Sequence, residues 1–315
     1  MVTSFPDADT VRTALASAIR APSVHNSQPW RWRAGTDRLD LFAVPELHLR
    51  HIDPDGRDLM LSCGATLHHA VVAFAALGWQ ARVHRFPGSD PNHLASLIFS
   101  PRPPTDTERA LAAAIPGRRT DRRRYSSREV SPADIAVMGA RAARGGVSLR
   151  RVESMSGLRA AVERAMDTHL HDDGYLRELT MWSGRYGAVA GVPAANVPSP
   201  DMAATVPARV FAGSGSVRAG AGGTDHAVVL ALGTRDDDAL ARLRAGEATS
   251  VVLLTATAIG LASCPVTEPL EIRETRWALR EEIFECRAHP QMLLRIGWAP
   301  ADAAPLPATP RRPLP

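Results

Sequence analysis

Residues 59–77 are rich in alanine and almost wholly apolar, and they restrict the fold more than any other stretch. A helix that is apolar on nearly all sides has no face for solvent, so we predict that it is buried. A second segment matches it without a gap at an offset of 182 residues. Gly64–Trp79 and Gly246–Leu261 both begin with Gly, run through Ala, Val, Leu and Thr, and end at Gly before a large apolar residue. The pair indicates either an internal repeat or a chance likeness of two buried helices.

Hydrophobic periodicity predicts helices and strands on both sides of Pro116-Gly117. The first part contains a helix over 7–20, strands at 39–44, 82–86 and 94–99, and a short helix over 108–115. The second part contains strands at 147–152, 226–232 and 292–296 and helices over 156–170 and 277–284. We therefore predict a mixture of helices and strands, with the midpoint of the chain at Pro116-Gly117 dividing it into 1–115 and 116–315.

All 37 basic side chains are arginine, because the chain contains no lysine. This excludes a Schiff-base lysine, a P-loop and a Ser-x-x-Lys nucleophile, so any bound phosphate is held by guanidinium groups, hydroxyls or backbone N–H groups. The net charge of +4 and the pI near 9.5 invite a nucleic-acid interpretation. The single dense basic cluster, 118–124, and only three tyrosines make it the minority interpretation, and we expect no nucleic-acid partner.

Cysteine usage and hydropathy indicate a soluble protein. Cys63, Cys264 and Cys286 are widely spaced and odd in number, which fits neither a disulfide framework nor a Cys-x-x-Cys metal site. Neighbouring His68 and His69 point about 100° apart on a helix, so we expect a structural role for them and no metal. The chain has no charged leader before an apolar run, and no stretch approaches about 18 uninterrupted apolar residues. We expect a cytoplasmic protein without a membrane partner.

The loop at 21–32, Ala-Pro-Ser-Val-His-Asn-Ser-Gln-Pro-Trp-Arg-Trp, is dense in polar side chains. Pro22 disfavours helical geometry at the residue before it, and Pro29 prevents a further turn before a strand begins. Amide and hydroxyl groups packed this closely suit a flat polar ring better than an ion. The alternative is a helix-capping turn followed by a buried strand.

The segment 118–125 combines five arginines with Thr120 between a Pro-Gly turn and a helix start at Ser131. In an extended segment alternate residues point the same way, so Arg118, Thr120 and Arg122 would share one face. The alternative is a solvated surface run. Arg311 and Arg312 add two more guanidinium groups in a proline-rich tail, which could equally be frayed.

The stretch from about Trp182 to Gly223 loses charge and gains Gly, Pro, Ala and Ser. A loop-rich stretch of this length is either partly disordered or a cover over a site. Its Gly213-Ser-Gly-Ser216 lacks the Gly-x-Ser-x-Gly spacing, which argues against a serine hydrolase.

Together these motifs resemble the nitroreductase superfamily. Pro-Ser-x-x-Asn-Ser-Gln-Pro-Trp at 22–30 resembles the loop that holds one edge of FMN, and Arg-Arg-Thr-x-Arg at 118–122 resembles the Arg-Arg-Ser-x-Arg segment that grips its phosphate. Ordinary nitroreductases are homodimers in which one subunit supplies the loop and the partner supplies the arginines, the turn after the central helix and a C-terminal basic residue. Here the loop lies in the first half and the other parts in the second, a pattern similar to the Acg-type branch.

The resemblance implies an α+β nitroreductase-like fold with two pseudo-symmetric halves in one chain, one complete FMN site and a loop-rich lid at about 182–223. The implied ring-binding residues are Pro22, Ser23, Val24, Asn26 and Gln28, with Pro265, Val266 and Thr267 near flavin N5. The implied phosphate-binding residues are Arg118, Arg119, Thr120, Arg122, Arg311 and Arg312. No catalytic side chain and no metal is implied, because the flavin N5 does the chemistry. Val24 and Thr267 depart from polar and acidic residues common in relatives.

The implied function is an FMN-dependent NAD(P)H oxidoreductase that passes hydride to a flat nitroaromatic or quinone acceptor. The alternative is a protein that stores or sequesters FMN under a closed lid, with little reductase activity. In either case the resemblance implies a monomer or a weak homodimer.

Overall fold

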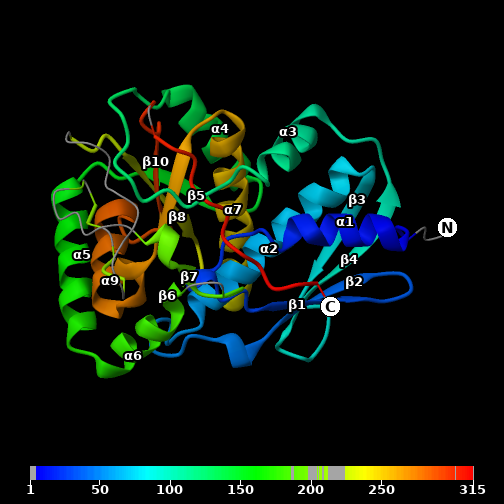
Figure 1. Ribbon diagram of the computed structural model, residues 1–315, viewed down its shortest axis with the longest axis horizontal. Helices are drawn as coiled ribbons and strands as arrows, with labels where there is room; N and C mark the ends of the chain where they lie inside the picture. The colour runs from blue at the N-terminus through cyan, green and yellow to red at the C-terminus, as the bar shows by residue number, and fades with distance from the viewer. Residues whose placement is uncertain are drawn as a thin grey trace.

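The computed structural model describes residues 5–185, 188–197, 204, 206–207, 209–211, 224–301 and 303–314. Within these ranges the chain forms two four-stranded antiparallel sheets with helices around and between them (Figure 1). The predicted α+β class is confirmed. Much of the stretch 182–223, where we expected a lid, lies outside the described residues, as does Gly213–Ser216.

The first sheet has the strand order β1-β2-β4-β3. Its strands are β1 (Trp30–Ala34), β2 (Leu39–Ala43), β3 (Trp79–Arg85) and β4 (His93–Pro101). The helical elements of this part are α1 (Ala8–Ala18), η1 (Val24–Asn26), η2 (Pro45–Leu47), α2 (Arg57–Ala76) and α3 (Asp106–Ala114). A capping box between Thr105 and Glu108 begins α3 two residues before the predicted start at 108.

The second sheet has the strand order β5-β8-β10-β9. Its strands are β5 (Ser148–Arg151), β8 (Val228–Thr234), β9 (Ala262–Val266) and β10 (His289–Gly297). Its helices are α4 (Pro132–Ala143), α5 (Met155–Leu170), α6 (Asp173–Trp182), α7 (Ala239–Ala258), α8 (Glu268–Glu271) and α9 (Arg273–Phe284). A short parallel pair, β6 (Ser183–Arg185) and β7 (Val192–Pro193), and the turn η3 (Ala194–Asn196) follow α6. The helix α6 has no counterpart among the predicted elements.

The two 20-residue helices α2 and α7 pack against each other between the sheets (Figure 1). Leu61 of α2 belongs to the core of the second sheet, whereas Leu243 of α7 belongs to the core of the first. These two leucines are again 182 positions apart. Each long helix therefore contributes to the hydrophobic core on the far side as well as to its own.

The helix α2 is long and apolar enough to cross a membrane by length and composition, but 78% of its most apolar window is buried inside the protein. This agrees with the predicted buried helix. Asp53 accepts a hydrogen bond from the backbone N–H of Leu59 at 2.8 Å, so a carboxylate from the preceding turn satisfies a free donor of the first helical turn.

Candidate functional site

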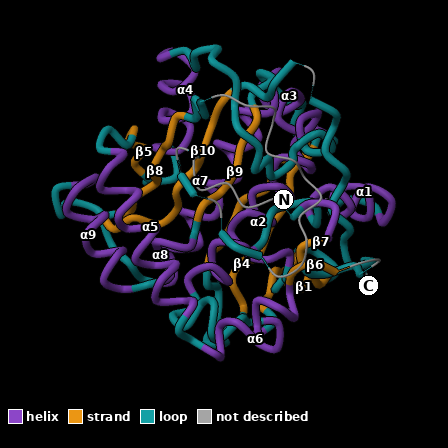
Figure 2. Tube along the Cα trace, turned by 60° about the vertical axis from the view of Figure 1, so that its left-hand side comes forward, coloured by secondary structure: helices purple, strands orange, loops and turns teal. Residues whose placement is uncertain are grey.

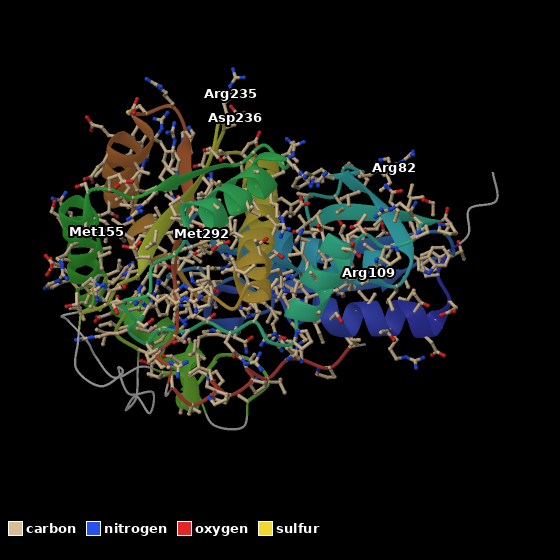
Figure 3. All side chains as sticks on the ribbon, turned by 90° about the horizontal axis from the view of Figure 1, so that it is seen from above. Arg82, Arg109, Met155, Arg235, Asp236 and Met292 are labelled. Carbon is tan, nitrogen blue, oxygen red and sulfur yellow. The ribbon has the colours of Figure 1, made fainter. Side chains whose placement is uncertain are left out.

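A cavity lies where α2 meets the second sheet, and it contains about 1040 Å³ of empty space, part of it open to solvent. A concave site in which a few polar groups converge from several elements is where a small molecule is expected to bind. Its wall residues come from 22–25, 58–65, 120–122, 206–211 and 264–269. Met292 of β10 also lines it, and Figure 3 shows this residue near the middle of the molecule.

One wall is a single face of α2. Asp58, Leu61, Ser62 and Ala65 line the cavity at helical spacing, as residues at i, i+3, i+4 and i+7 must when one face is presented. The hydroxyl of Ser62 accepts a hydrogen bond from the backbone N–H of Val24 at 3.1 Å. This bond attaches the polar loop of the first half to the helix.

The polar loop turns through an uncommon backbone conformation. His25, Asn26 and Gln28 all have positive φ, at 45°, 55° and 54°, a region that side chains other than glycine seldom adopt. The Ser23 hydroxyl stabilises the turn by accepting from the backbone N–H of Gln28 at 3.0 Å. As a result Pro22, Ser23, Val24 and His25 face the cavity.

The structure brings together eight of the predicted site residues and leaves six outside the cavity wall. Those that line it are Pro22, Ser23, Val24, Thr120, Arg122, Pro265, Val266 and Thr267. Those that do not are Asn26, Gln28, Arg118, Arg119, Arg311 and Arg312.

The amides of Asn26 and Gln28 bind backbone groups of other segments. Asn26 donates to the carbonyl oxygens of Gly191 and Pro310, both at 3.2 Å. Gln28 donates to the carbonyl of Val189 at 2.8 Å, and its own carbonyl accepts from the backbone N–H of Arg312 at 2.8 Å. The loop thus fastens both the segment at 188–197 and the C-terminal tail, which lie close together in Figure 2.

Arg118 is buried with two of its guanidinium nitrogens, Nε and Nη1, lacking a hydrogen-bond partner among the described residues. Burial, followed by the nearby charges of Arg311, Arg119 and Arg20, lowers the pKa of Arg118 to about 9. Arg311 itself donates to the carbonyl oxygens of residues 19–21, immediately before Pro22. We call these four arginines the guanidinium cluster. Within the described part of the chain, the charged neighbours named for Arg118 are all arginines, so the cluster is suited to a multiply charged anion.

Arg122 extends from the same segment into the cavity. Its guanidinium lies 4.9 Å from the ring centroid of Phe211, and burial lowers its pKa. We expected one common face for Arg118, Thr120 and Arg122, but the structure separates them. Thr120 and Arg122 line the cavity, whereas Arg118 belongs to the guanidinium cluster.

A buried polar network beside the cavity was not among the predicted site residues. Arg209 forms an ion pair with Glu271 and donates to the Tyr175 hydroxyl at 3.0 Å and to His25 Nε2 at 3.1 Å. His169 contacts Glu268 at 3.2 Å. The one sequence signal for this network is Arg209, a rare charge within a stretch that is otherwise nearly uncharged.

Asp58 of α2 was also absent from the predicted site residues. It is 2% exposed, it lines the cavity, and neither carboxyl oxygen has a hydrogen-bond partner among the described residues. Burial raises the pKa of this carboxyl well above its usual value, and the negative charges of Asp53 and Glu271 raise it further against the opposing effect of Arg57 and Arg209. Burial and the two negative neighbours therefore favour the neutral form of Asp58 at the cavity wall.

Comparisons with known proteins place the chain among relatives of full length. Two proteins of Mycobacterium tuberculosis (strain ATCC 25618 / H37Rv) carry the name "Putative NAD(P)H nitroreductase", one with the suffix Rv3131 and one with the suffix acg. The first is 59% identical over 317 residues, covering 100% of this chain and 92% of the relative. The second is 38% identical over 318 residues, covering 97% of this chain and 94% of the relative. No family model matches the chain.

Among solved structures, a nitroreductase with bound FMN from Bacteroides fragilis NCTC 9343 aligns with a TM-score of 0.40 and 16% identity. The alignment covers 62% of this chain and 90% of the other, a likeness too low to carry an argument. The two mycobacterial relatives are similar over nearly their whole length. The chain therefore belongs to the nitroreductase family, in the group that includes the mycobacterial protein acg.

Proposed function

We propose that this protein is an FMN-dependent oxidoreductase that takes hydride from NAD(P)H and reduces a flat aromatic acceptor, such as a nitroaromatic compound or a quinone. The observation that carries the proposal is Arg118, which is buried with two nitrogens lacking a hydrogen-bond partner among the described residues, in a segment whose Thr120 and Arg122 line the cavity. Burying a cation without a counter-charge costs free energy. A ligand that supplies negative charge at the guanidinium cluster would offset that cost. The names of the mycobacterial relatives support the same activity.

The residues present fit FMN. Its phosphate carries close to two negative charges, which the unpartnered nitrogens of Arg118, the Arg311 guanidinium and the Thr120 hydroxyl could bind with charge-assisted hydrogen bonds. Pro22 and Val266 offer apolar surface to a flat ring, and Ser23 and Arg122 offer polar groups at its edge. When bound, FMN supplies hydride chemistry that no side chain of this protein could supply.

The protein's own groups bind and orient the ligands and limit the access of water. We assign Asn26, Gln28, Arg119 and Arg312 to positioning rather than to direct contact with FMN. Asn26 and Gln28 hold the tail in place, and Arg119 donates to the carbonyl of Leu306 at 3.3 Å. The tail in turn carries Arg311 to the guanidinium cluster.

We further propose that residues 1–115 and 116–315 are two pseudo-symmetric halves of a fused dimer with one FMN site. The two sheets, the paired helices α2 and α7 and the reciprocal placing of Leu61 and Leu243 support this. Such a chain would act in the cytoplasm as a monomer or a weak homodimer, with a small-molecule acceptor as its partner and without nucleic acid or membrane.

A second candidate function is FMN storage. Val206, Arg209 and Phe211 line the cavity, and Arg209 is tied to Glu271, Tyr175 and His25. If this cover stays closed over bound FMN, nicotinamide has no room beside the ring.

An anaerobic experiment separates the two candidates. We would load the purified protein with FMN, add NADPH without oxygen and follow the yellow absorbance by stopped flow. Bleaching within seconds, followed by recovery of the colour on adding a quinone, is expected for the reductase. Persistent colour would favour storage, and a protein that takes up no FMN would refute both.

A further inference from the structure

The cavity wall contains an acid to which the proposed function has so far given no role. Asp58 lies in the first turn of α2, 2% exposed, with both carboxyl oxygens unpartnered among the described residues. A buried polar group without a partner costs roughly 1–3 kcal/mol. A side chain as small as asparagine or serine would fill this position without a titratable group, so the presence of the acid calls for a chemical explanation.

The charged groups that shift the pKa of Asp58 come from four places in the fold. Asp53 from the preceding turn and Glu271 from α8 are negative, whereas Arg57 from α2 and Arg209 from the segment 209–211 are positive. Arg57 already donates to the carbonyl oxygens of Leu270 and Gln291. Burial and the negative neighbours therefore favour the protonated form of Asp58, while Arg57 and Arg209 favour a carboxylate that forms briefly.

We propose that Asp58 is the proton donor to the acceptor that is reduced in this cavity. The proposal rests on the proposed reductase function and deepens it, because it assigns a catalytic side chain to the second half of the reaction. A buried acid whose neutral form is favoured and which faces the ligand cavity meets the two needs of a general acid, which are a proton to give and access to the substrate.

The atoms and charges of the step balance. A quinone that receives a hydride becomes a hydroquinone monoanion, and the O–H bond of Asp58 breaks as the new O–H bond of the hydroquinone forms. A nitro group that receives a hydride and this proton becomes a nitroso group with loss of water. In both cases Asp58 is left as a carboxylate, and it regains a proton from solvent through the open side of the cavity after the product leaves.

The test uses the full chain loaded with FMN and the variant Asp58→Asn, which keeps the size and polarity of the side chain but has no proton to transfer. FMN content and anaerobic reduction are expected to stay within about twofold of the unsubstituted protein. Reoxidation by a quinone is expected to slow by about 10²-fold or more, the usual contribution of a general acid. The solvent deuterium isotope effect on reoxidation should also be lost, and Asp58→Glu should recover part of the rate. Reoxidation at the unsubstituted rate in Asp58→Asn would overturn the proposal.

Failure of the proposed function is recognised separately, because dithionite can reduce the bound FMN when NADPH does not. Reoxidation of dithionite-reduced protein then tests Asp58 in the same way. Asp55→Asn is the matched control, since Asp55 lies three residues earlier and pairs with Arg276 outside the cavity wall. It is expected to leave both half-reactions unchanged.

A readout without FMN tests the protonation state directly. When folding raises the pKa of a carboxyl, the group contributes fully to stability only while the pH lies below its pKa in the unfolded chain, about 3.9. This contribution is lost as the pH rises through the pKa of the carboxyl in the folded protein. The melting temperature of Asp58→Asn minus that of the unsubstituted protein should therefore grow between about pH 4 and pH 7. A difference that stays constant would mean that Asp58 does not titrate there, and an ionised Asp58 could not be the donor.

Discussion

Gly64 and Gly246 face each other where α2 crosses α7, so closely that a Cβ atom built on either would lie 2.9 Å from the Cα atom of the other. The contact is reciprocal, because a Cβ on Gly64 would collide with the carbonyl oxygen of Leu243, and one on Gly246 with that of Leu61. The two long helices thus touch through their backbones. Since α2 forms one wall of the cavity and α7 packs on the second sheet, this crossing helps to set the cavity's shape.

Replacing Gly64 with alanine should destabilise the protein. The added methyl group meets backbone atoms that cannot rotate away, so we expect a loss of about 3 kcal/mol or more in the free energy of unfolding, at or above the usual cost of overpacking. Urea denaturation followed by tryptophan fluorescence measures it. Gly139→Ala in α4 is the control, because its Cβ would meet Leu149 at an ordinary 3.9 Å, and it should gain up to about 1 kcal/mol. Equal stability of the two variants would contradict the backbone contact.

Replacing Arg118 with methionine should weaken FMN binding through the phosphate. A hydrogen bond to a charged group contributes about 1.5–3 kcal/mol, so the dissociation constant for FMN is expected to rise roughly 10- to 100-fold. Riboflavin, which lacks the phosphate, should bind the variant and the unsubstituted protein equally. Fluorescence titration measures both ligands, and the exposed Arg164→Met on α5 serves as the control. Equal losses for FMN and riboflavin would place Arg118 away from the phosphate.

Replacing Gln28 with alanine should release the C-terminal tail. The variant loses the bond to the backbone N–H of Arg312 and the bond to the carbonyl of Val189, so trypsin should cut the Arg311–Arg312 bond faster. Mass spectrometry of brief digests follows the cleavage. Gln80→Ala on the exposed side of β3 should digest as the unsubstituted protein does. If the tail is cleaved no faster in Gln28→Ala, then Gln28 is free to act as a ligand group instead.

Acidification should destabilise the protein through His68. Its Nδ1 lies 2.7 Å from the Ser250 hydroxyl, and burial lowers its pKa to about 4. Because folding lowers the pKa of His68, this residue contributes fully to the free energy of unfolding above its pKa in the unfolded chain, about 6.5. The contribution is lost as the pH falls through the pKa of His68 in the folded protein, about 4. His68→Gln should remove about 3 kcal/mol of this pH dependence, at 1.36 kcal/mol per unit. Parallel curves of unfolding free energy against pH for both proteins would contradict it.

Local sequence signals predicted most of the elements, though not α6, and eight of the residues that line the cavity. Apolar runs located α2 and most of α7, and Ser131 marked the start of α4. Pro22 and Pro29 marked the turn that carries Ser23 to the cavity. These signals succeed because helix periodicity, capping and proline geometry act over only a few residues.

Such local signals could not predict contacts between segments that are distant in the sequence. The sequence identified Asn26 as a polar group in a sharp turn, but its partners Gly191 and Pro310 are 165 and 284 positions away. In the same way Arg209 meets Glu271 only when the segment 209–211 packs beside α8.

The sequence by itself determined the family, the α+β class, the two buried helices and the loop and arginine segments of the site. Only the tertiary structure decided which of those side chains line the cavity, left two nitrogens of Arg118 without a hydrogen-bond partner among the described residues and buried Asp58 at the wall. The physical reason is that local structure follows from short-range sterics and hydrogen bonding. Burial, charge neighbours and unsatisfied polar atoms depend instead on how α2 and α7 bring segments together from opposite ends of the chain.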